Sequence, residues 1–376
     1  MEFAWTAAQR QRYEDAFAAA RDAFPEERAH SFDRESWRVL GELGLLGACL
    51  SPEYGGQGLG ALDTARIFEA FGHGCADTGL VFAAAAHLFA CAMPIAEFGS
   101  PALRERLLRG MAAGELVAGN AMTEADAGSD VGRLSTVAER VDGGYRLTGT
   151  KTFVSNGPVA DVFVTYAVTD PTAGHFGISA FVVDATAPGV LLDEPLHKLG
   201  MDGCAAGAVT FDDCPVPEQN LLGAAGQGSA VFQHSMGWER ACLFALYIGL
   251  QDRLIEQTVR HVRGRKQFGQ RLADFQSVTN RIVDMKVRVE SARLLLYRTC
   301  WAHDAGEHTV LYAALSKLAT SEAALASATD AVQLFGYRGY LRGNGIESAL
   351  RDAMGSTIFS GASDIQRQLI AIEMGL

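Results

Sequence analysis

The hydrophobic period changes twice along the 376-residue chain, and these changes constrain its fold more than any other feature. In the first third, apolar residues recur at helical spacing, beginning with Trp37, Leu40, Leu43 and Leu46. After residue 118 the chain switches to short β-branched or aromatic runs, and beyond Gly226 the helical period returns. This order predicts an N-terminal α-helical domain (1–118), a middle β domain (119–225) and a C-terminal four-helix-bundle domain (226–376).

The middle segment carries four runs typical of strands, at 145–148, 163–168, 178–183 and 208–211. Clusters of Gly, Pro, Asn and Asp separate them, which is the punctuation of an antiparallel sheet. The chain shows no strand–helix–strand alternation and no GxGxxG motif after a strand, so a Rossmann nicotinamide enzyme is disfavoured. The predicted fold class is α+β.

Composition excludes several classes of function. The net charge is −12 with Lys and Arg scattered along the chain, which disfavours nucleic acid and anionic membranes as partners. The first residues do not resemble a signal peptide and no stretch approaches the roughly 20 apolar residues of a membrane span, so we expect a cytoplasmic protein. The seven cysteines are dispersed without a CxxC pair and the nine histidines form no ligand set, so neither a disulfide framework nor a metal site is expected.

Two motifs lie in the middle segment. Residues 121–131 (AMTEADAGSDV) offer hydroxyls and backbone amides from a Gly-containing loop. Residues 149–157 (GTKTFVSNG) place Phe153 and Ser155 two positions apart, so a strand would present a ring and a hydroxyl on one face. A half-buried strand that ends at an Asn-Gly turn is the alternative interpretation of the second motif.

Three further motifs lie in the C-terminal part. Residues 265–269 (RKQFG) precede Phe275-Gln276, and an arginine there suits a pyrophosphate because a guanidinium donates paired hydrogen bonds. Residues 330–340 (DAVQLFGYRGY) contain a Gly-rich turn, in which Tyr337 interrupts the glycines. Residues 351–367 contain Ser360-Gly361-Ala362.

In their order and over essentially the whole length, these motifs resemble those of the acyl-CoA dehydrogenase family. The resemblance implies bound FAD and a homodimer or homotetramer, since the family's arginine at position 265 reaches the FAD of a neighbouring subunit. It implies as cofactor-binding residues Met122, Thr123, Gly128, Ser129, Phe153, Ser155, Arg265, Phe268, Gln276, Gln333, Gly336, Tyr337, Ala362 and Asp364. It implies as substrate-binding residues Ser129, Gly237, Arg240, Ser360 and Gly361.

The catalytic base is the main departure from the family pattern. Many members carry a catalytic Glu where this chain has Ser360, and a hydroxyl is a poor base at neutral pH. A branch that includes the isovaleryl-CoA enzymes places its base one residue before an arginine in an earlier helix, where this chain has Glu239. The resemblance therefore implies Glu239 as the base, with a pKa raised by burial. The alternative is a surface or helix-start glutamate paired with Arg240.

The substrate carrier is left open by further departures. CoA-binding members often have Asp at position 237, and Arg and Ser are frequent at positions 202 and 204, whereas this chain has Gly237, Asp202 and Cys204. Similar replacements occur in members that act on acyl or aminoacyl groups held by a carrier protein in polyketide or peptide pathways. The acyl thioester is therefore expected on CoA or on an acyl carrier protein.

The leading hypothesis is FAD-dependent α,β-dehydrogenation of an acyl thioester, with Glu239 taking the α-proton. Electron-transfer flavoprotein is the electron acceptor that the resemblance implies. The alternatives are a flavin-dependent oxidase or monooxygenase on the same fold, and a catalytically degenerate acyl-binding homologue.

Overall fold

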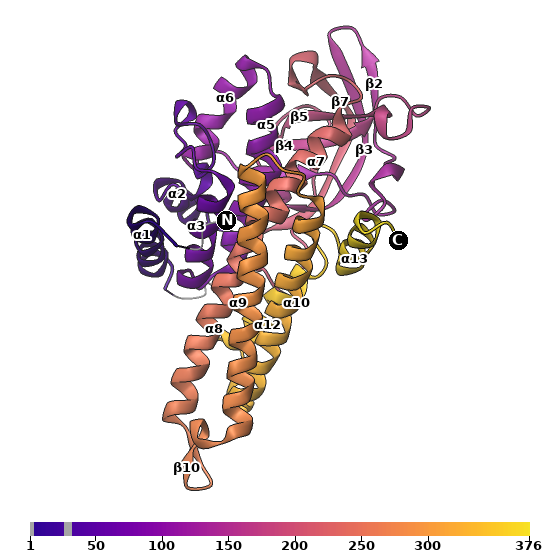
Figure 1. The fold of residues 1–376 in the computed structure, drawn as a ribbon. Helices are drawn as coiled ribbons and strands as arrows, with labels where there is room; N and C mark the ends of the chain where they lie inside the picture. The colour runs from indigo at the N-terminus through magenta and orange to yellow at the C-terminus, as the bar shows by residue number, and fades with distance from the viewer. Residues whose placement is uncertain (1–3, 26–31) are drawn as a thin grey trace.

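The computed structural model describes residues 4–25 and 32–376. Helices come first, a β-sheet follows, and long helices return, so the predicted α+β architecture is confirmed. Figure 1 shows the sheet at one end, the first helices beside it, and a bundle of long helices that projects away from both.

The N-terminal helices are short and several begin at a side-chain cap. Asp33 accepts hydrogen bonds from the backbone of residues 35 and 36, and Ser100 precedes a proline at the first helical position. These helices are α1 (Ala7–Ala23), α2 (Arg34–Glu42), α3 (Ala61–Gly74), α4 (Thr78–His87), α5 (Met93–Phe98) and α6 (Pro101–Ala112). A π-helical segment, η3 (Leu88–Ala92), joins α4 to α5.

The sheet has eight strands within the described residues and the order β6-β7-β3-β2-β4-β5-β8, with β1 beside β4. Most neighbours are antiparallel, as predicted, whereas β4 pairs in parallel with β1 and, at one position, with β2. The strands are β1 (Ala118–Ala121), β2 (Val137–Val141), β3 (Gly144–Ser155), β4 (Val162–Val168), β5 (Ile178–Asp184), β6 (Val190–Leu192), β7 (Ala206–Pro217) and β8 (Leu221–Leu222).

The C-terminal helices are α7 (Gly228–Trp238), α8 (Ala245–Gly264), α9 (Gln276–Asp304), α10 (Val310–Phe335), α11 (Tyr337–Tyr340), α12 (Ile346–Ser356) and α13 (Ser363–Glu373). A second π-helical segment, η8 (Glu239–Leu243), connects α7 to α8. A small hairpin of β9 (Lys266–Gln267) and β10 (Gln270–Arg271) caps the far end of the bundle (Figure 1). Positive φ angles at Phe268 and Gly269 give this hairpin its two-residue turn.

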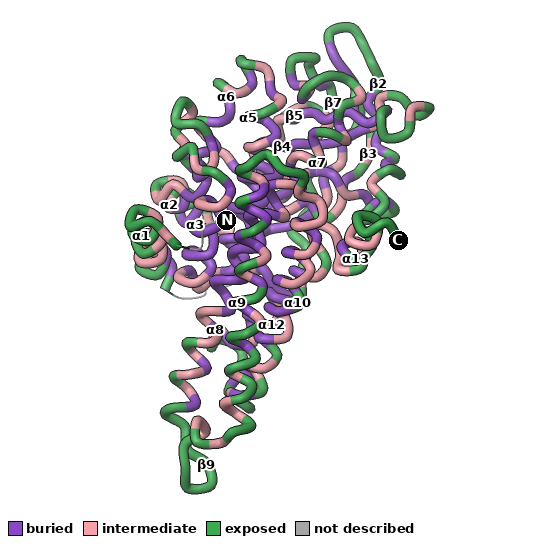
Figure 2. The backbone as a smooth tube through the Cα atoms, in the orientation of Figure 1, coloured by how far each residue is buried: buried purple, intermediate pink, exposed green. Residues whose placement is uncertain are grey.

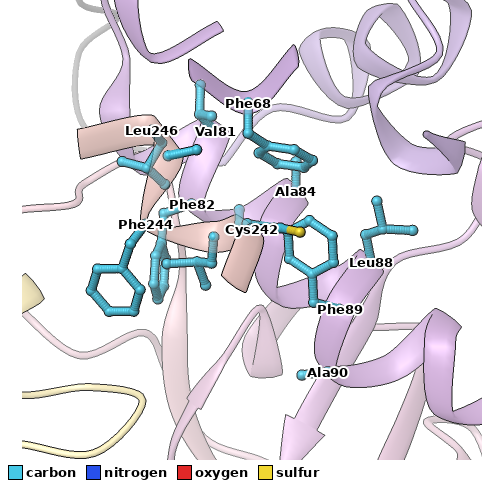
Figure 3. Close-up of a cluster of buried hydrophobic side chains, with 14 of the residues drawn as sticks. Phe68, Val81, Phe82, Ala84, Leu88, Phe89, Ala90, Cys242, Phe244 and Leu246 are labelled. Atoms are coloured by element: carbon cyan, nitrogen blue, oxygen red, sulfur yellow. The ribbon is translucent and has the colours of Figure 1, made fainter. Parts of the chain in front are cut away.

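The core lies where the first helices, the sheet and the upper part of the bundle meet, and the bundle tip is exposed (Figure 2). Figure 3 shows that Phe89 and Phe82 from the first helices face Cys242 and Phe244 at the start of the bundle. All four side chains are buried, so the two π-helical segments are fixed against each other by apolar packing.

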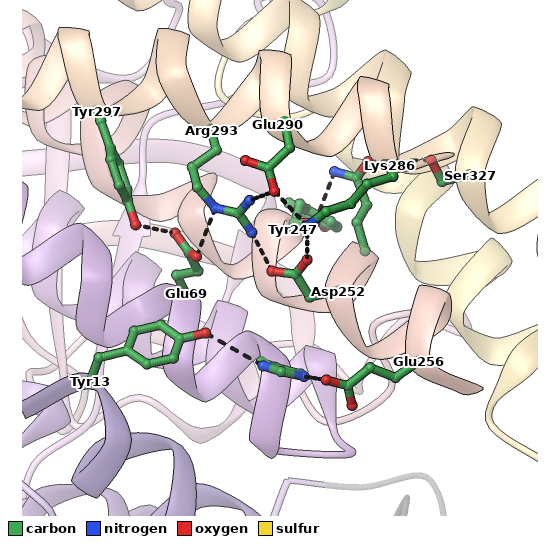
Figure 4. A network of polar contacts seen from close by, with 12 residues as sticks. Tyr13, Glu69, Tyr247, Asp252, Glu256, Lys286, Glu290, Arg293, Tyr297 and Ser327 are labelled. Carbon is green, nitrogen blue, oxygen red and sulfur yellow. Dashed lines mark hydrogen bonds and ion pairs between the residues drawn. The ribbon is translucent and has the colours of Figure 1, made fainter. Parts of the chain in front are cut away.

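A polar network also joins the first helices to the bundle (Figure 4). Arg293 of α9 donates to Glu69 of α3 at 3.0 Å and pairs with Asp252 of α8, while Tyr297 donates to Glu69 at 2.8 Å. Burial raises the pKa of Glu69, although the charge of Arg293 opposes this. Because one guanidinium serves carboxylates from two helices, the network fixes α3 relative to the bundle.

One described segment, Thr78–Phe98, is long and apolar enough to cross a membrane, so the expectation that no stretch approaches this length is wrong. Of its most apolar window, 94% is buried inside the protein. Such burial is typical of a core helix.

Candidate active site

Glu239 lies at the first position of η8, directly after Trp238. Its side chain is buried, with 6% of the residue exposed, and its Oε2 accepts a hydrogen bond from Ser360 Oγ at 2.6 Å. Its other oxygen, Oε1, is buried and has no hydrogen-bond partner among the described residues. The alternative of a surface glutamate is therefore wrong, and one carboxylate oxygen is left for a ligand.

The electrostatics of Glu239 suit a general base. Burial raises its pKa to about 7, while the Ser360 hydrogen bond and the positive charge of Arg240 act in the opposite direction. A carboxyl with this pKa is partly ionised at neutral pH and still basic enough to accept a proton. The expected rise of the Glu239 pKa through burial is thus confirmed.

The segment that carries Ser360 is held in place by its backbone. Ser360 has a φ of +52° and Gly361 a φ of +89°, which form a left-handed turn before α13. Arg240 Nε donates to Ser360 O at 3.4 Å, and Gln366 Nε2 donates to Gly361 O at 2.9 Å. The structure therefore brings together Glu239, Arg240, Ser360 and Gly361, four of the predicted site residues.

Aromatic side chains that neighbour Ser360 and Glu239 in the sequence pack against rings of the first helices and of the bundle. Phe359, next to Ser360, packs against Phe82 at a ring-centroid distance of 4.4 Å and against Phe244 at 5.9 Å. On the other side Trp238 lies parallel to Phe89 at 6.3 Å. Sequence reasoning missed Phe82 and Phe89, because the apolar stretch 80–93 reads only as a core helix.

The middle domain presents an exposed aromatic face. A β-bulge interrupts the pairing of β3 with β7 between Lys151 and Val154, and Phe153 there has a φ of +56° and is 66% exposed. Thr152 N donates to Thr123 O at 2.8 Å, which joins the two predicted motifs, and Thr152 Oγ1 is buried with no hydrogen-bond partner in the part of the chain that the structure describes. The exposed ring of Phe153 and the unpaired hydroxyl of Thr152 are suited to the isoalloxazine ring of FAD, which is planar and has polar edges.

A buried ion pair that sequence reasoning missed supports this face. Lys151 Nζ donates to Glu124 Oε1 at 2.8 Å, and neither side chain is more than 5% exposed. Glu124 also accepts from the backbone of Ser135 and Thr136, and these hydrogen bonds, with that of Lys151, lower its pKa to about 2 against the effect of burial. Lys151 Nζ reaches Met122 O at 3.2 Å and so anchors the loop that leads to Ser129.

The remaining predicted residues fall into separate places. Six lie toward the bundle tip, far from β3 in one chain (Figure 1): Arg265, Phe268, Gln276, Gln333, Gly336 and Tyr337. Arg281 near the start of α9 donates to Gln333 at 2.7 Å, which places the end of α10 beside that tip, and Phe268 is 94% exposed. Ala362 and Asp364 lie at the start of α13, whereas Gly128 and Ser129 are exposed in the loop after β1.

Gly237 is half-buried on α7, and a Cβ there would lie 4.0 Å from His303 Nε2. Asp202 pairs with Arg351 at 3.2 Å, and the thiol of Cys204 is buried and donates to Asn156 Oδ1 at 3.6 Å. None of these three residues offers a free charged group to a ligand. No group of three or more His, Cys, Asp and Glu residues in the described ranges is arranged to hold a metal ion.

Comparison with known families covers nearly the whole chain. Three family profiles match: "Acyl-CoA dehydrogenase, N-terminal domain" at residues 6–115, "Acyl-CoA dehydrogenase, middle domain" at 119–214 and "Acyl-CoA dehydrogenase, C-terminal domain" at 226–375.

Individual relatives are also similar over most of their length. An L-prolyl-[peptidyl-carrier protein] dehydrogenase of Pseudomonas fluorescens is 54% identical over 351 residues, which cover 93% of this chain and 92% of the relative. The structure of PigA with FAD and proline matches with a TM-score of 0.97 and 40% identity over all of both chains. The prolyl acyl carrier protein oxidase AnaB matches with a TM-score of 0.94 and 37% identity, over 99% of this chain and all of that one.

Proposed function

The chain belongs to the acyl-CoA dehydrogenase family and catalyses FAD-dependent dehydrogenation of an acyl thioester, and we propose that its acyl group is prolyl, held on a peptidyl-carrier protein. The relative that shares 54% of its residues is named for this substrate. The single observation in the structure that carries the proposal is Glu239, a buried carboxylate with one bonded and one free oxygen.

The contacts of the pantetheine-facing positions support a carrier protein over CoA. Gly237 has no carboxylate, Asp202 is occupied by Arg351, and Cys204 is buried. A substrate delivered by a carrier gains affinity from protein–protein contacts, so the enzyme depends less on charged groups along the arm.

The aromatic wall supports a compact acyl group. Phe359, which precedes Ser360, packs against Phe82 and Phe244, and we infer that these three rings line the acyl site. A long acyl chain would have to displace them, whereas a five-membered ring adds little length beyond the α-carbon. We therefore assign this wall the role of excluding longer acyl chains.

In the proposed mechanism Glu239 accepts the proton from the prolyl α-carbon. Its pKa of about 7 leaves it about half ionised at neutral pH, and Ser360 fixes the carboxylate through Oε2. Arg240 holds the carbonyl of Ser360, so the base and its partner keep their relative position. FAD, when bound, supplies the acceptor for the hydride from the β-carbon.

We propose that FAD is held by Met122, Thr123, Gly128, Ser129, Phe153, Ser155, Ala362 and Asp364 of one subunit. The residues at the bundle tip and at the end of α10 would hold the FAD of a second copy, since within one chain they lie far from β3 (Figure 1). The exposed ring of Phe268 supports such a contact. The proposal therefore requires at least a homodimer, which we place in the cytoplasm.

Electron-transfer flavoprotein is the proposed acceptor of the electrons. An oxidase is the second candidate, favoured by the 37% identity to AnaB, which is named as an oxidase. Mixing the reduced enzyme with oxygen or with electron-transfer flavoprotein separates the two, because only an oxidase is reoxidised rapidly by oxygen alone.

Anaerobic bleaching of the bound flavin tests the proposed substrate. Prolyl-carrier protein, prolyl-CoA and butyryl-CoA are mixed in turn with the FAD-loaded enzyme and with its Glu239→Gln variant. We expect rapid bleaching of the wild-type flavin by prolyl-carrier protein alone, and none in the variant although it retains FAD. Equal bleaching by butyryl-CoA would contradict the assignment.

A further inference from the structure

A second polar group, close enough to Glu239 for the charge of that carboxylate to raise its pKa, is not used by the mechanism. Tyr166 of β4 is completely buried, and its hydroxyl has no hydrogen-bond partner among the described residues. A buried hydroxyl left unpaired costs stability, so a fold retains one where a ligand or a water completes it. Glu239 Oε1 is likewise buried without a hydrogen-bond partner among the described residues, as are Asn120 Oδ1 of β1 and His234 Nε2 of α7.

Helix geometry places the two groups on the same side. Phe232, Ser235 and Glu239 follow at intervals of three and four residues, so they lie along one face of α7 and the start of η8. The ring of Tyr166 meets the ring of Phe232 edge-on, with centroids 5.8 Å apart. The hydroxyl of Ser235 donates to Phe232 O at 2.8 Å, and although it lies close enough to Tyr166 to lower the pKa of the phenol, no hydrogen bond of normal geometry joins the two side chains.

Cys91 of η3 is also buried and lies close enough to Tyr166 and Glu239 to interact electrostatically with both. Burial, and then the negative charge of Glu239, raise the pKa of Cys91, so it remains a thiol. Burial and Cys91 likewise raise the pKa of Tyr166, while Ser235 opposes this, so the residue remains a phenol. A phenol can donate one hydrogen bond and accept others.

Resting on the proposed function, we infer that Tyr166 determines specificity for an α-amino acyl group by binding the nitrogen next to the α-carbon. The phenol donates to that nitrogen when it is neutral and accepts from it when it is protonated, and Glu239 Oε1 lies on the same side of the helix. An acyl group without the nitrogen leaves the buried phenol unpaired, which lowers its binding.

A pair of isosteric substrates tests this role. The carrier protein is loaded with prolyl or with cyclopentanecarbonyl, in which CH₂ replaces the ring NH, and kcat and KM are measured from flavin bleaching. We expect the wild type to prefer prolyl by about 10–100-fold in kcat/KM. Tyr166→Phe should reduce this preference to near unity, mainly by raising KM for prolyl, and leave cyclopentanecarbonyl unchanged.

Tyr145→Phe is the matched control. Tyr145 is also a buried tyrosine of the sheet, but its ring packs on Phe181 and its hydroxyl accepts from Arg140 at 2.8 Å. This variant should keep the preference of the wild type.

Three outcomes would overturn the inference. The first is a wild type that accepts both substrates equally, which leaves the proposed prolyl activity standing, and this result does not depend on any variant folding. The second is a Tyr166→Phe enzyme that retains the preference or loses activity equally on both substrates. The third is a wild type that bleaches with neither carrier-borne substrate, which removes the proposed function and this inference with it.

Discussion

Replacing Ser360 by alanine removes the hydroxyl that donates to Glu239 Oε2 over 2.6 Å, and the pKa of Glu239 should rise. A hydrogen bond to a charged group contributes about 1.5–3 kcal/mol, and one pKa unit corresponds to about 1.4 kcal/mol. The pKa of Glu239, which is about 7 in the intact site, should therefore rise by about one to two units. The ionised fraction of the base at pH 7 falls accordingly.

The assay is the rate of anaerobic flavin bleaching by saturating prolyl-carrier protein as a function of pH. At pH 7 the base is about half ionised in the wild type and about 1–10% ionised in the variant, so bleaching should slow by about 5–50-fold. Above about pH 9.5 the two rates should converge, since both carboxyls are then ionised.

Ser356→Ala is the control, because Ser356 is a nearby buried serine whose hydroxyl donates to Ala353 O at 2.6 Å and not to the base. It should leave the pH profile unchanged. The reasoning is refuted if Ser360→Ala keeps the wild-type profile, or if its profile moves to lower pH, while Glu239→Gln remains inactive.

Three further predictions concern stability and acyl length. The pKa of Glu239 is about 7 in the folded protein and 4.5 ordinarily, so ionisation of this carboxyl destabilises the fold as pH rises from about 4.5 to 7. Glu239→Gln cannot ionise, so it should be more stable than the wild type by up to about 3 kcal/mol at pH 8 and equally stable near pH 4. Urea unfolding measures this difference. The pKa of Glu124 is lowered to about 2, so the stability that its ionised form contributes is lost as pH falls from about 4.5 toward 2. Glu124→Gln leaves the buried Lys151 without its ion-pair partner, and its free energy of unfolding at pH 7 should be about 3 kcal/mol lower than that of the wild type in the same assay. Phe82→Ala removes the ring that packs on Phe359, so hexanoyl-carrier protein, inert with the wild type, should bleach the variant's flavin; an unchanged acyl preference would place the acyl group elsewhere.

Local patterns carried much of the fold. Each of the four predicted runs lies inside a strand, because hydrophobic period and turn residues are properties of neighbouring residues. The direction of strand pairing is set by contacts far apart in the sequence. The parallel pairing of β1 with β4 joins residues 118 and 162, and no pattern of neighbouring residues in the sequence predicts it.

The site divides in the same way. This chain has Ser360 where many family members have the catalytic glutamate, and this difference pointed to Glu239 as the base. The hydrogen bond between Ser360 and Glu239 could not be predicted, because the two residues are 121 positions apart and meet only in the folded chain. Lys151 lies in the motif at 149–157, whereas Glu124, with which it forms an ion pair, lies in the motif at 121–131, so neither motif alone predicts the pair. Tyr166 reads as an ordinary strand residue, because the absence of a partner for its hydroxyl depends on the packing of α7 and η3.

The mass of the carrier-bound acyl group tests the central claim most directly. Prolyl-carrier protein is incubated with the FAD-loaded enzyme and an electron acceptor, and the intact carrier is then weighed by mass spectrometry. The account predicts that the prolyl group loses hydrogens in pairs with the wild type and keeps its mass with Glu239→Gln. An unchanged mass with the wild type, or the same loss with the variant, would contradict it.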